Sequence, residues 1–509
     1  MLTGFILTDV NRLANVLSCS KDKLNEVLSS YVQSCNSYIT WQVIDASDSL
    51  YDNANKSDWR TFASILGDFY EGLGLRGTSY CPLFIIGGND VVPMPPMQNP
   101  IGSIGGEYLY SDMAYCFDTN NNLKLSEFVS STPRFAVGRL PLTKDWDLEA
   151  LSAYLNDCVE MAAQGISVRG AAMTTTQSWL RASKEMMRDL PTVSLSTDYV
   201  PLNEKMIVSP DLDMDYQEMV DGYIHELKKV DFLVCNLHGC DRKGLPVFFG
   251  EDVECKSHPI ALKPQVLEQT SPSIFNTVAC FGGRYIDYEL DDSMLLTALA
   301  YGTMLYCGSC EIALGGHNME GYSELLMKLY NIYLHKGIPA GLALIKAKQD
   351  YYRTCHDEES DEGAMFTILE FNLFGCPIVS MQPKLGYDYQ PHLLGHNISQ
   401  KSLVSYRPKT IEVISGGAQK ADDIHAYIQG LVDNNLSIIK QKVEKDVYQR
   451  LGLGSENLQQ VMRVSQDNFE LGYQFLYAWT PQESMRYFEM YYLVSTDRNG
   501  EITKIIHTK

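Results

Sequence analysis

The chain has 509 residues, a net charge of −22, and 45% hydrophobic residues, which is enough apolar material for sizeable cores in several domain-sized units. This acidic balance, without clustered lysine and arginine, argues against a nucleic acid or an anionic membrane as partner. No apolar run approaches the roughly 18 residues that a membrane-spanning helix needs.

The N-terminal segment and the cysteines both predict a cytoplasmic protein. An acid at Asp9 and the lack of a basic stretch before the first apolar residues do not fit a secretion signal. The 13 cysteines are an odd number without disulfide-like spacing, which is typical of a reducing compartment. Cys307 and Cys310 have the spacing of half a zinc site, but no second pair follows. We therefore assign no metal ligand.

Strand-like and helix-like segments alternate through the first three quarters of the chain, which predicts an α/β fold. Alternation of this kind implies parallel strands with right-handed crossovers, so we expect two adjacent Rossmann-like sheets. No G-x-G-x-x-G follows a strand, and nucleotide binding has little support. The expected strands lie at 38–46, 83–88, 134–138, 170–176, 196–202 and 232–237, with two more ending at Cys280 and Cys307, and the expected helices at 58–72, 143–164, 181–190 and 216–229.

After residue 382 the composition changes. Turn-forming residues without a sustained period predict a linker over 383–408. A helical stretch at 421–451 and strand-like stretches at 472–480, 486–494 and 501–507 follow, the last two joined by a strong turn signal at 497–500. We predict an N-terminal α/β subdomain at 1–142, a catalytic α/β subdomain at 143–382, and a small C-terminal α+β module of unknown role at 409–509.

Two apolar runs that each end at a reactive residue carry the functional signal. FLVCNLHG ends at His238 and Gly239, and NTVACFGG contains Cys280. An apolar run closed by glycine is typical of a buried parallel strand, so both side chains should lie at the sheet edge where α/β proteins keep their sites. An imidazole beside a thiol lowers the pKa of the thiol and moves its proton, which makes an acyl-transfer nucleophile. The N–H groups of Gly239 and Cys280 could bind the developing oxyanion.

Either residue alone would predict little. A single cysteine at a strand end is usually a small buried hydrophobe, and this chain has 13 of them. The combination of strand-His-Gly with strand-Ala-Cys-x-Gly-Gly one crossover later favours catalysis over packing.

The two motifs together resemble the caspase-like (clan CD) cysteine peptidases. Five further segments are similar to the gingipain-like branch of that group, and the ordered matches span roughly residues 80–380. One departure is Cys376, which stands where an aspartate is usual and is expected to affect packing. The five segments are CPLFIIGGNDVVP (81–93), YSDMAY (110–115), PRFAVGRLP (133–141), YGTMLYCGS (301–309) and FNLFGCP (371–377).

The resemblance implies roles for further residues. Asp112 in YSDMAY would orient the imidazole of His238, with a loop-capping aspartate as the alternative. The backbone of Cys307, Gly308 and Ser309 would pair with an extended substrate, and residues 311–321 would wall the pocket. Asp118 or Glu127 would pair with a substrate Arg or Lys, whereas Arg284 pointing into the pocket would favour acidic substrates. These pocket acids compete with the commoner case of solvated loop carboxylates.

We therefore expect a bacterial, cytoplasmic cysteine endopeptidase that cleaves proteins or peptides after Arg or Lys. It would require no cofactor, although the family resemblance allows a structural calcium ion. The alternative is an inactive caspase-like scaffold that acts through its C-terminal module, which the presence of both His238 and Cys280 disfavours. A peptidase inside a cell must be held inactive, so we expect gating by a regulatory protein partner or by processing. Candidate elements are the acidic loop 356–363, a cut near Arg353, and the module after Gln382.

Overall fold

The computed structural model describes most of the chain. It covers residues 2–48, 55–75, 80–102, 104–117, 133–188, 206–208, 224–225, 227–241, 246–251, 258–316, 321–355, 361–382, 410–416, 434–466, 469–479 and 490–508. The expected strand at 196–202, the linker at 383–408 and the pocket acids Asp118 and Glu127 lie outside these residues, as does most of the expected helix at 216–229.

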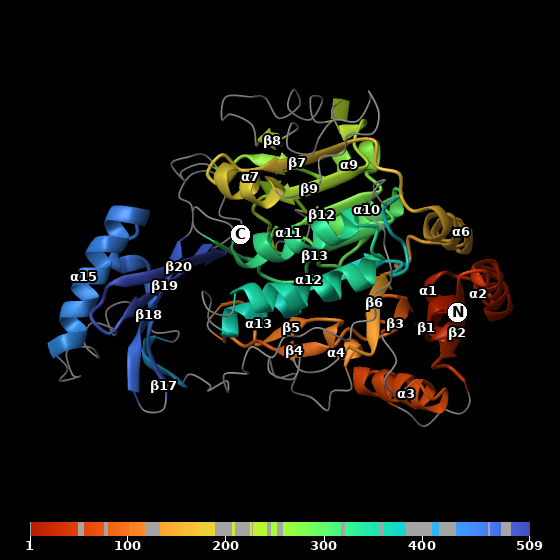
Figure 1. Ribbon diagram of the computed structural model, residues 1–509, viewed down its shortest axis with the longest axis horizontal. Coiled ribbons are helices and arrows are strands. Elements are labelled where there is room, and N and C mark those ends of the chain that lie inside the picture. The colour runs from red at the N-terminus through yellow and green to blue at the C-terminus, as the bar shows by residue number, and fades with distance from the viewer. Residues whose placement is uncertain are drawn as a thin grey trace. The chain divides into compact units, whose positions relative to one another are not determined.

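A ten-stranded sheet forms the centre of the larger part of the molecule (Figure 1). One half holds four mutually parallel strands in the order β2 (Ile39–Asp45), β1 (Leu2–Thr8), β3 (Cys81–Ile86) and β6 (Phe135–Leu140). All residues of β3 and β6 are buried, which is typical of strands covered on both faces. The prediction for β2, β3 and β6 is confirmed, whereas β1 was not expected as a strand.

The other half of the sheet carries the two reactive motifs. Its parallel strands lie in the order β13 (Leu305–Ser309), β12 (Ile274–Thr277), β9 (Phe232–Asn236), β7 (Ala171–Thr175) and β8 (Met206–Val208). Strand β15 (Phe371–Gly375) joins the halves, antiparallel to β13 and parallel to β6. The α/β prediction is confirmed, but the two expected sheets are one continuous sheet with a single reversal of direction.

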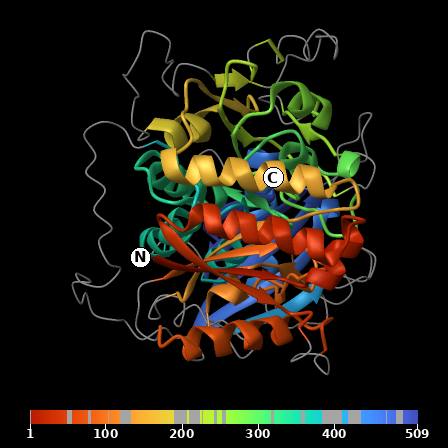
Figure 2. The same cartoon turned by 90° about the vertical axis from the view of Figure 1, so that its right-hand side faces the viewer.

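Helices cover the sheet, which explains why its strands are buried. Figure 1 shows α11 (Tyr322–His335) and α12 (Ala340–Cys355) lying across the strands. Helices α2 (Lys21–Cys35) and α6 (Leu148–Gln164) run side by side in Figure 2. Helix α3 (Trp59–Gly72) matches the predicted 58–72, whereas α6 begins at 148 rather than 143 because Asp147 caps it by accepting a hydrogen bond from the Ala150 N–H.

The remaining elements of this part are short or peripheral. They are α1 (Val10–Val16), β4 (Pro96–Gln98), β5 (Tyr108–Tyr110), α4 (Met113–Cys116), α7 (Leu180–Arg188), β10 (Phe248–Phe249), β11 (Ile260–Leu262), α9 (Pro264–Thr270), η3 (Leu290–Asp292), α10 (Met294–Ala300) and α13 (Asp361–Glu370). No helix among the described residues is both long and apolar enough to cross a membrane. The fully buried Cys376 contacts the hydroxyl of Tyr31 at 3.3 Å.

A second sheet is antiparallel and six-stranded. Its order is β14 (Leu314–Gly316), β20 (Ile502–Thr508), β19 (Met490–Asp497), β18 (Phe469–Trp479), β17 (Leu458–Gln466) and β16 (Thr410–Gly416). Helix α15 (Asn434–Leu451) contributes Ile439, Val443 and Val447 to a core with residues of these strands, and η4 (Ser455–Asn457) precedes β17. The predicted turn between β19 and β20 is present, with Gly500 at φ +79°. This module is α+β, as predicted.

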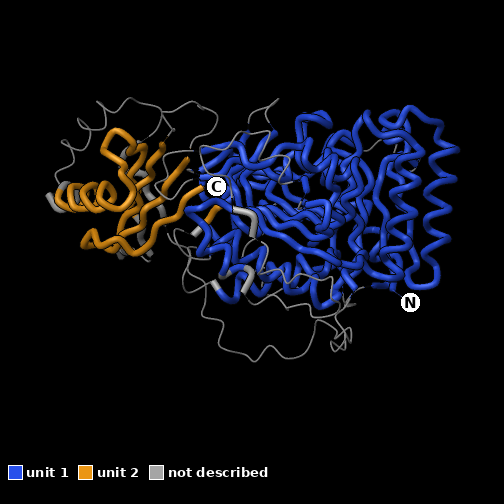
Figure 3. Tube along the Cα trace, turned by 90° about the horizontal axis from the view of Figure 1, so that it is seen from above, with its two compact units in different colours: residues 1–313, 318–396 blue, residues 314–317, 397–509 orange. Residues whose placement is uncertain are grey.

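The chain divides into two compact units (Figure 3). The first contains residues 1–313 and 318–396, and the second contains 314–317 and 397–509. The two subdomains expected at 1–142 and 143–382 share one sheet and therefore form one unit. The short strand β14 belongs to the second unit although it follows the predicted catalytic segment in sequence.

Candidate active site

The fold brings the two reactive motifs together. Strands β9 and β12 are parallel neighbours, with Asn236 two residues before His238 and Thr277 three residues before Cys280. Gly239 lies directly against the backbone of Cys280, so close that a Cβ at this position would meet the Cys280 carbonyl oxygen at 1.6 Å and its nitrogen at 2.9 Å. Only glycine allows this approach. The backbone N–H groups predicted to bind an oxyanion therefore come from adjacent segments.

The thiol of Cys280 is buried and held by a neighbouring segment. The residue is 3% exposed. The Ala313 N–H donates to Sγ at 3.2 Å, and Sγ contacts the Ala313 carbonyl oxygen at 3.7 Å. The next residue, Phe281, has a φ of +56°, a backbone conformation that costs a bulky residue about 1–3 kcal/mol and is concentrated at functional sites.

His238 is fully buried and lies beside an acid that the sequence did not single out. Its Nε2 is 3.5 Å from Oε1 of Glu251, and the ring of Trp179 lies 4.3 Å away between centroids. His238 and Phe249 exchange backbone hydrogen bonds, which places Glu251 two residues beyond this bridge. The short strand pair β10–β11 therefore delivers a carboxylate to the imidazole.

Glu251 is suited to remain ionised in this buried position. Burial opposes its ionisation, but interaction with His238, His258 and the Ser178 hydroxyl holds the pKa of Glu251 well below its usual value. Ser178 donates a hydrogen bond to Oε2. The other carboxylate oxygen, Oε1, is also 3.4 Å from Nε2 of His258. An ionised acid at this place can fix the orientation of the His238 ring.

Asp112, the predicted orienting acid, is engaged elsewhere. Its two carboxylate oxygens accept hydrogen bonds from the guanidinium of Arg139 at 2.6 and 2.8 Å. Arg139 is fully buried and also donates to the carbonyl oxygens of Gly87 and Val92. This bidentate pair holds the Asp112 segment against Arg139 of β6. The prediction for Asp112 is therefore corrected, because its charge is already satisfied by Arg139, and the acid beside His238 is Glu251.

The predicted substrate-pairing residues are corrected for a similar reason. Cys307, Gly308 and Ser309 lie in β13, an interior strand whose neighbours are β12 and β15. All of them are buried, and β15 pairs with all three. On the other side, β12 pairs with Cys307, and the Gly283 N–H donates to the Ser309 carbonyl oxygen at 2.7 Å. A substrate strand needs an open edge, which β13 does not offer. The chain segment that continues from β13, at Glu311 to Ala313, is the one that contacts Cys280 and Phe281.

Arg284 does not bring an unpaired positive charge to the site. Its guanidinium forms an ion pair with Asp241 and lies over the rings of Phe281 and Tyr288. Glu311, whose carbonyl oxygen accepts from the Phe281 N–H at 2.6 Å, is the acid beside the segment that carries Cys280. Burial raises the pKa of Glu311 to about 7, although Arg284 opposes this shift.

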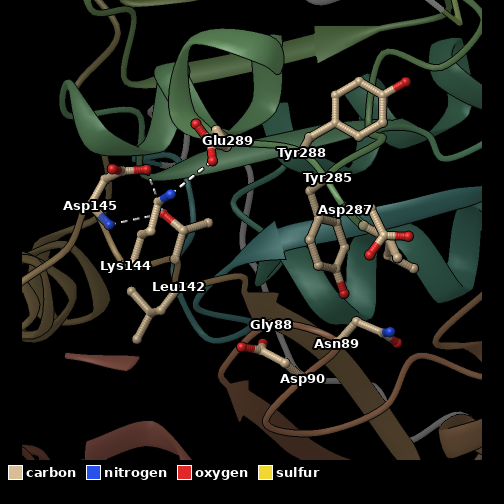
Figure 4. Close-up of a pocket in the computed structure, with 12 residues that line it drawn as sticks. Gly88, Asn89, Asp90, Leu142, Lys144, Asp145, Tyr285, Asp287, Tyr288 and Glu289 are labelled. Carbon is tan, nitrogen blue, oxygen red and sulfur yellow. Dashed lines mark hydrogen bonds and ion pairs between the residues drawn. The ribbon is translucent and has the colours of Figure 1, made fainter. Parts of the chain in front are cut away.

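A separate pocket of about 360 Å³ lies where the segments after β3, β6 and Cys280 meet (Figure 4). Lys144 and Glu289 form an ion pair of 2.7 Å across one side, and the Tyr285 ring faces the opposite wall. Neither His238 nor Cys280 lines this pocket. We therefore do not place catalysis there.

The sequence contains a local signal for Glu251 that the family resemblance does not include. VFFGE (247–251) is a short apolar run closed by glycine and followed by an acid, the same pattern that identified His238. Trp179 and Ser178 follow the predicted strand GAAMTTT directly. No sequence pattern around His258 indicates its role. Its position beside Glu251 depends on the tertiary structure.

Among the described residues, one cluster of at least three His, Cys, Asp or Glu side chains could hold a metal ion: His238, Glu251 and His258. Calcium prefers six to eight oxygen ligands, and this cluster offers two nitrogens. This cluster therefore does not fit calcium. The structural calcium ion that the family resemblance allows stays a prediction.

No protein-family model matches the chain, and no curated protein matches its sequence. Among solved structures, the chain is similar in fold to one described as the structure of a protease, with a TM-score of 0.50 and 10% identity, covering 100% of this chain and 97% of that one.

Two further solved structures are those of gingipains. One is the Arg-specific cysteine proteinase gingipain R (RgpB), with a TM-score of 0.47 and 10% identity, covering 99% of this chain and 96% of that one. The other is a complex of the pro- and mature domains of RgpB from Porphyromonas gingivalis, with a TM-score of 0.46 and 11% identity, covering 99% and 98%. The likeness to the solved protease confirms the predicted fold and, at 10% identity, says nothing further about activity.

Proposed function

We propose that the protein is a cysteine endopeptidase with Cys280 as nucleophile, His238 as general base and acid, and Glu251 as the residue that orients the imidazole. The main observation in favour of the proposal is the close contact between Gly239 and the backbone of Cys280. This contact places the strand end that carries the buried His238 beside the strand end that carries the Cys280 thiol. The inactive scaffold has no comparable support, because a purely structural role requires neither a thiol nor an imidazole at this contact.

In the proposed reaction, Nε2 of His238 faces Glu251, so Nδ1 is the nitrogen that takes the proton from the Cys280 thiol. The thiolate attacks the carbonyl carbon of the peptide, and the oxyanion is bound by the N–H groups of Gly239 and Cys280. His238 then gives its proton to the leaving amine. Water, activated by the same imidazole, hydrolyses the acyl-enzyme and restores the thiol.

We assign the preference for Arg or Lys at the cleaved position to Glu311. It replaces Asp118 and Glu127, which lie outside the residues that the structure describes. Glu311 lies beside the nucleophile segment, and the charge of Arg284 is already paired with Asp241. A buried cation needs a carboxylate partner. The substrate backbone would contact the segment from Glu311 to Ala313.

Two observations support gating of the activity. The nucleophile is buried, and its Sγ is engaged by Ala313, so a substrate requires a rearrangement at this point. The chain passes from Ala313 directly into β14, which pairs with β20 of the second unit. A regulatory partner that binds the second unit would act through this connection. Cleavage near Arg353 stays a second proposed route to activation. A cytoplasmic location agrees with the 11 described cysteines, all of them free thiols.

Cleavage of a peptide library, followed by mass spectrometry, tests the proposal. Wild-type protein activated by limited proteolysis should cleave after Arg or Lys. Cys280→Ala treated in the same way should not cleave while retaining the fold, because one buried sulfur contributes little packing. Cys240→Ala removes the neighbouring half-buried thiol and should leave cleavage intact. Iodoacetamide at mildly acidic pH should modify Cys280 once limited proteolysis has exposed the site. Retained cleavage by Cys280→Ala would exclude the assigned nucleophile.

A further inference from the structure

The side chains of His238, Glu251 and His258 form a buried cluster that groups three metal-ligand types around one carboxylate oxygen. All three residues are buried, at 0%, 2% and 8% exposure. Nε2 of each histidine lies near the same oxygen, Oε1 of Glu251, at 3.5 Å for His238 and 3.4 Å for His258. Good N–H···O hydrogen bonds are about 2.7–3.2 Å long, so both distances exceed that range.

The same distances fit a metal ion held in common. Zinc binds histidine nitrogen and carboxylate oxygen at about 2.0–2.2 Å, and tetrahedral geometry then separates neighbouring ligand atoms by about 3.3–3.5 Å. The two N···O distances, 3.5 and 3.4 Å, lie at that separation. The ligand atoms of the three residues all lie within 4.8 Å of one another.

The surroundings also have the features of a zinc site. Two histidines and one glutamate are a ligand set that binds zinc in proteins, with water in the fourth position. Ser178 donates a hydrogen bond to Oε2 of Glu251, leaving Oε1 directed at the histidines. Such an outer hydrogen bond fixes a ligating carboxylate and contributes to metal affinity.

We propose that His238, Glu251 and His258 form a zinc site that reversibly inhibits the peptidase by occupying its general base. The inhibitory part of this inference rests on the proposed function, whereas the binding part does not. A neutral imidazole has one nitrogen with a free lone pair and one that carries a proton. When zinc takes the lone pair of Nε2, Nδ1 must carry the proton and cannot accept another from Cys280. Zinc binding and thiol activation therefore exclude each other.

This arrangement differs from a catalytic zinc enzyme built on similar ligands. There, the metal polarises a substrate or activates water, and its removal abolishes the reaction. Here, Cys280 supplies the nucleophile, and removal of the metal should increase activity. The direction of the zinc effect therefore separates the two chemistries.

The binding test uses Co²⁺ as a spectroscopic substitute for zinc on the full-length Cys280→Ala protein, which needs no peptidase activity. We expect the visible absorption of a four-coordinate ion, without the near-ultraviolet band of cobalt–thiolate bonds, and its displacement by one equivalent of Zn²⁺. Adding His258→Gln should abolish this spectrum. His335→Gln, which removes a buried histidine on α11 outside the cluster, is the matched control and should retain it. Circular dichroism without metal verifies that each variant is folded.

The inhibition test measures peptide cleavage by chelator-treated protein against free Zn²⁺. Zinc should abolish wild-type cleavage, a chelator should restore it, and His258→Gln should raise the inhibitory concentration at least tenfold while cleaving without zinc. An identical cobalt spectrum with and without His258 would overturn the site, and activation by zinc would overturn the inhibitory role. If cobalt binds as expected but the chelated protein cleaves no peptide even after limited proteolysis has opened the site, the zinc site stands and the proposed function fails.

Discussion

The two halves of the large sheet each contain a buried cluster of charged side chains, and the two clusters are built differently. In the half formed by β2, β1, β3 and β6, Arg139 and Asp112 make two short hydrogen bonds at 2.6 and 2.8 Å. In the half formed by β13, β12, β9, β7 and β8, Glu251 faces two histidines at 3.4 and 3.5 Å.

We infer that the difference separates a structural charge pair from the proposed catalytic site. A bidentate Arg–carboxylate pair satisfies both oxygens and holds its geometry. Two histidines that face one oxygen of a shared carboxylate present the ligand types of a metal site. Full burial alone would not distinguish the two clusters, since His238 and Arg139 are both 0% exposed.

The strongest test of this comparison exchanges the two acids for their amides. Glu251→Gln should lower kcat by about 10³–10⁴-fold, because the imidazole loses the carboxylate that fixes its orientation. Asp112→Asn should leave kcat per folded molecule nearly unchanged, because Asp112 faces Arg139. Steady-state kinetics with a peptide substrate, corrected for the folded fraction, measures both. The reverse pattern would restore Asp112 as the orienting acid.

Stability should respond in the opposite way. Arg139→Met leaves the Asp112 carboxylate buried without its partner and should lower the free energy of unfolding of the first unit by about 3–5 kcal/mol. Replacing both partners, as Arg139→Met with Asp112→Leu, should recover much of this loss. Urea unfolding monitored by circular dichroism gives the values. A cost below about 1 kcal/mol for Arg139→Met would show that the pair is not structural.

The contact between the His238 and Cys280 segments can be tested by adding one methyl group. Gly239→Ala places a Cβ 1.6 Å from the Cys280 carbonyl oxygen, so the two strand ends must separate. We expect kcat/KM to fall by about 10²-fold or more, the scale of losing one oxyanion donor. Gly67→Ala on α3, where a Cβ meets nothing within 4 Å, is the control and should leave kcat/KM unchanged. Equal activity of both variants would argue against the assigned oxyanion donors.

The smallest expected effect is the pH dependence of specificity. Since burial raises the pKa of Glu311 to about 7, this acid is mostly neutral at about pH 6 and mostly ionised at about pH 8. The ratio of kcat/KM for a substrate with Arg at the cleaved position to one with Gln should rise about tenfold over this range. The ratio cancels the ionisation of Cys280 and His238, which act on both substrates.

Glu311→Gln should make this ratio independent of pH, and a flat ratio in the wild type would assign the specificity elsewhere. The sign for stability is opposite. A raised carboxyl pKa contributes stability that is complete below its unfolded value and is lost as the pH rises through about 7. Thermal unfolding of wild type and Glu311→Gln from about pH 4 to about pH 8 measures that loss, which lies between the unfolded and folded pKa values.

The local pattern of the sequence determined most strands of the sheet and the positions of His238 and Cys280 just after two of them. The apolar runs that lead to His238 and Cys280 are each followed by glycine, which indicates a buried strand and a turn. Both signals depend only on residues that are neighbours in the sequence. The helices α3 and α7, and the hairpin between β19 and β20, follow from equally local signals. The predicted boundaries were less accurate where a cap decides them, as Asp147 does for α6.

Partner choice among buried polar groups was decided only by the tertiary structure. From the sequence, Asp112 could orient His238 or pair with Arg139. The sequence does not show which of these two residues lies closer to Asp112 in the folded protein. Three further features are also contacts between segments far apart in the chain. Strand β15 joins the two expected sheets, Cys307 to Ser309 lie in an interior strand, and β14 pairs with a strand of the second unit. His258 reaches Glu251 in the same way. Such contacts depend on which surfaces pack together, and local periodicity carries no information about that choice.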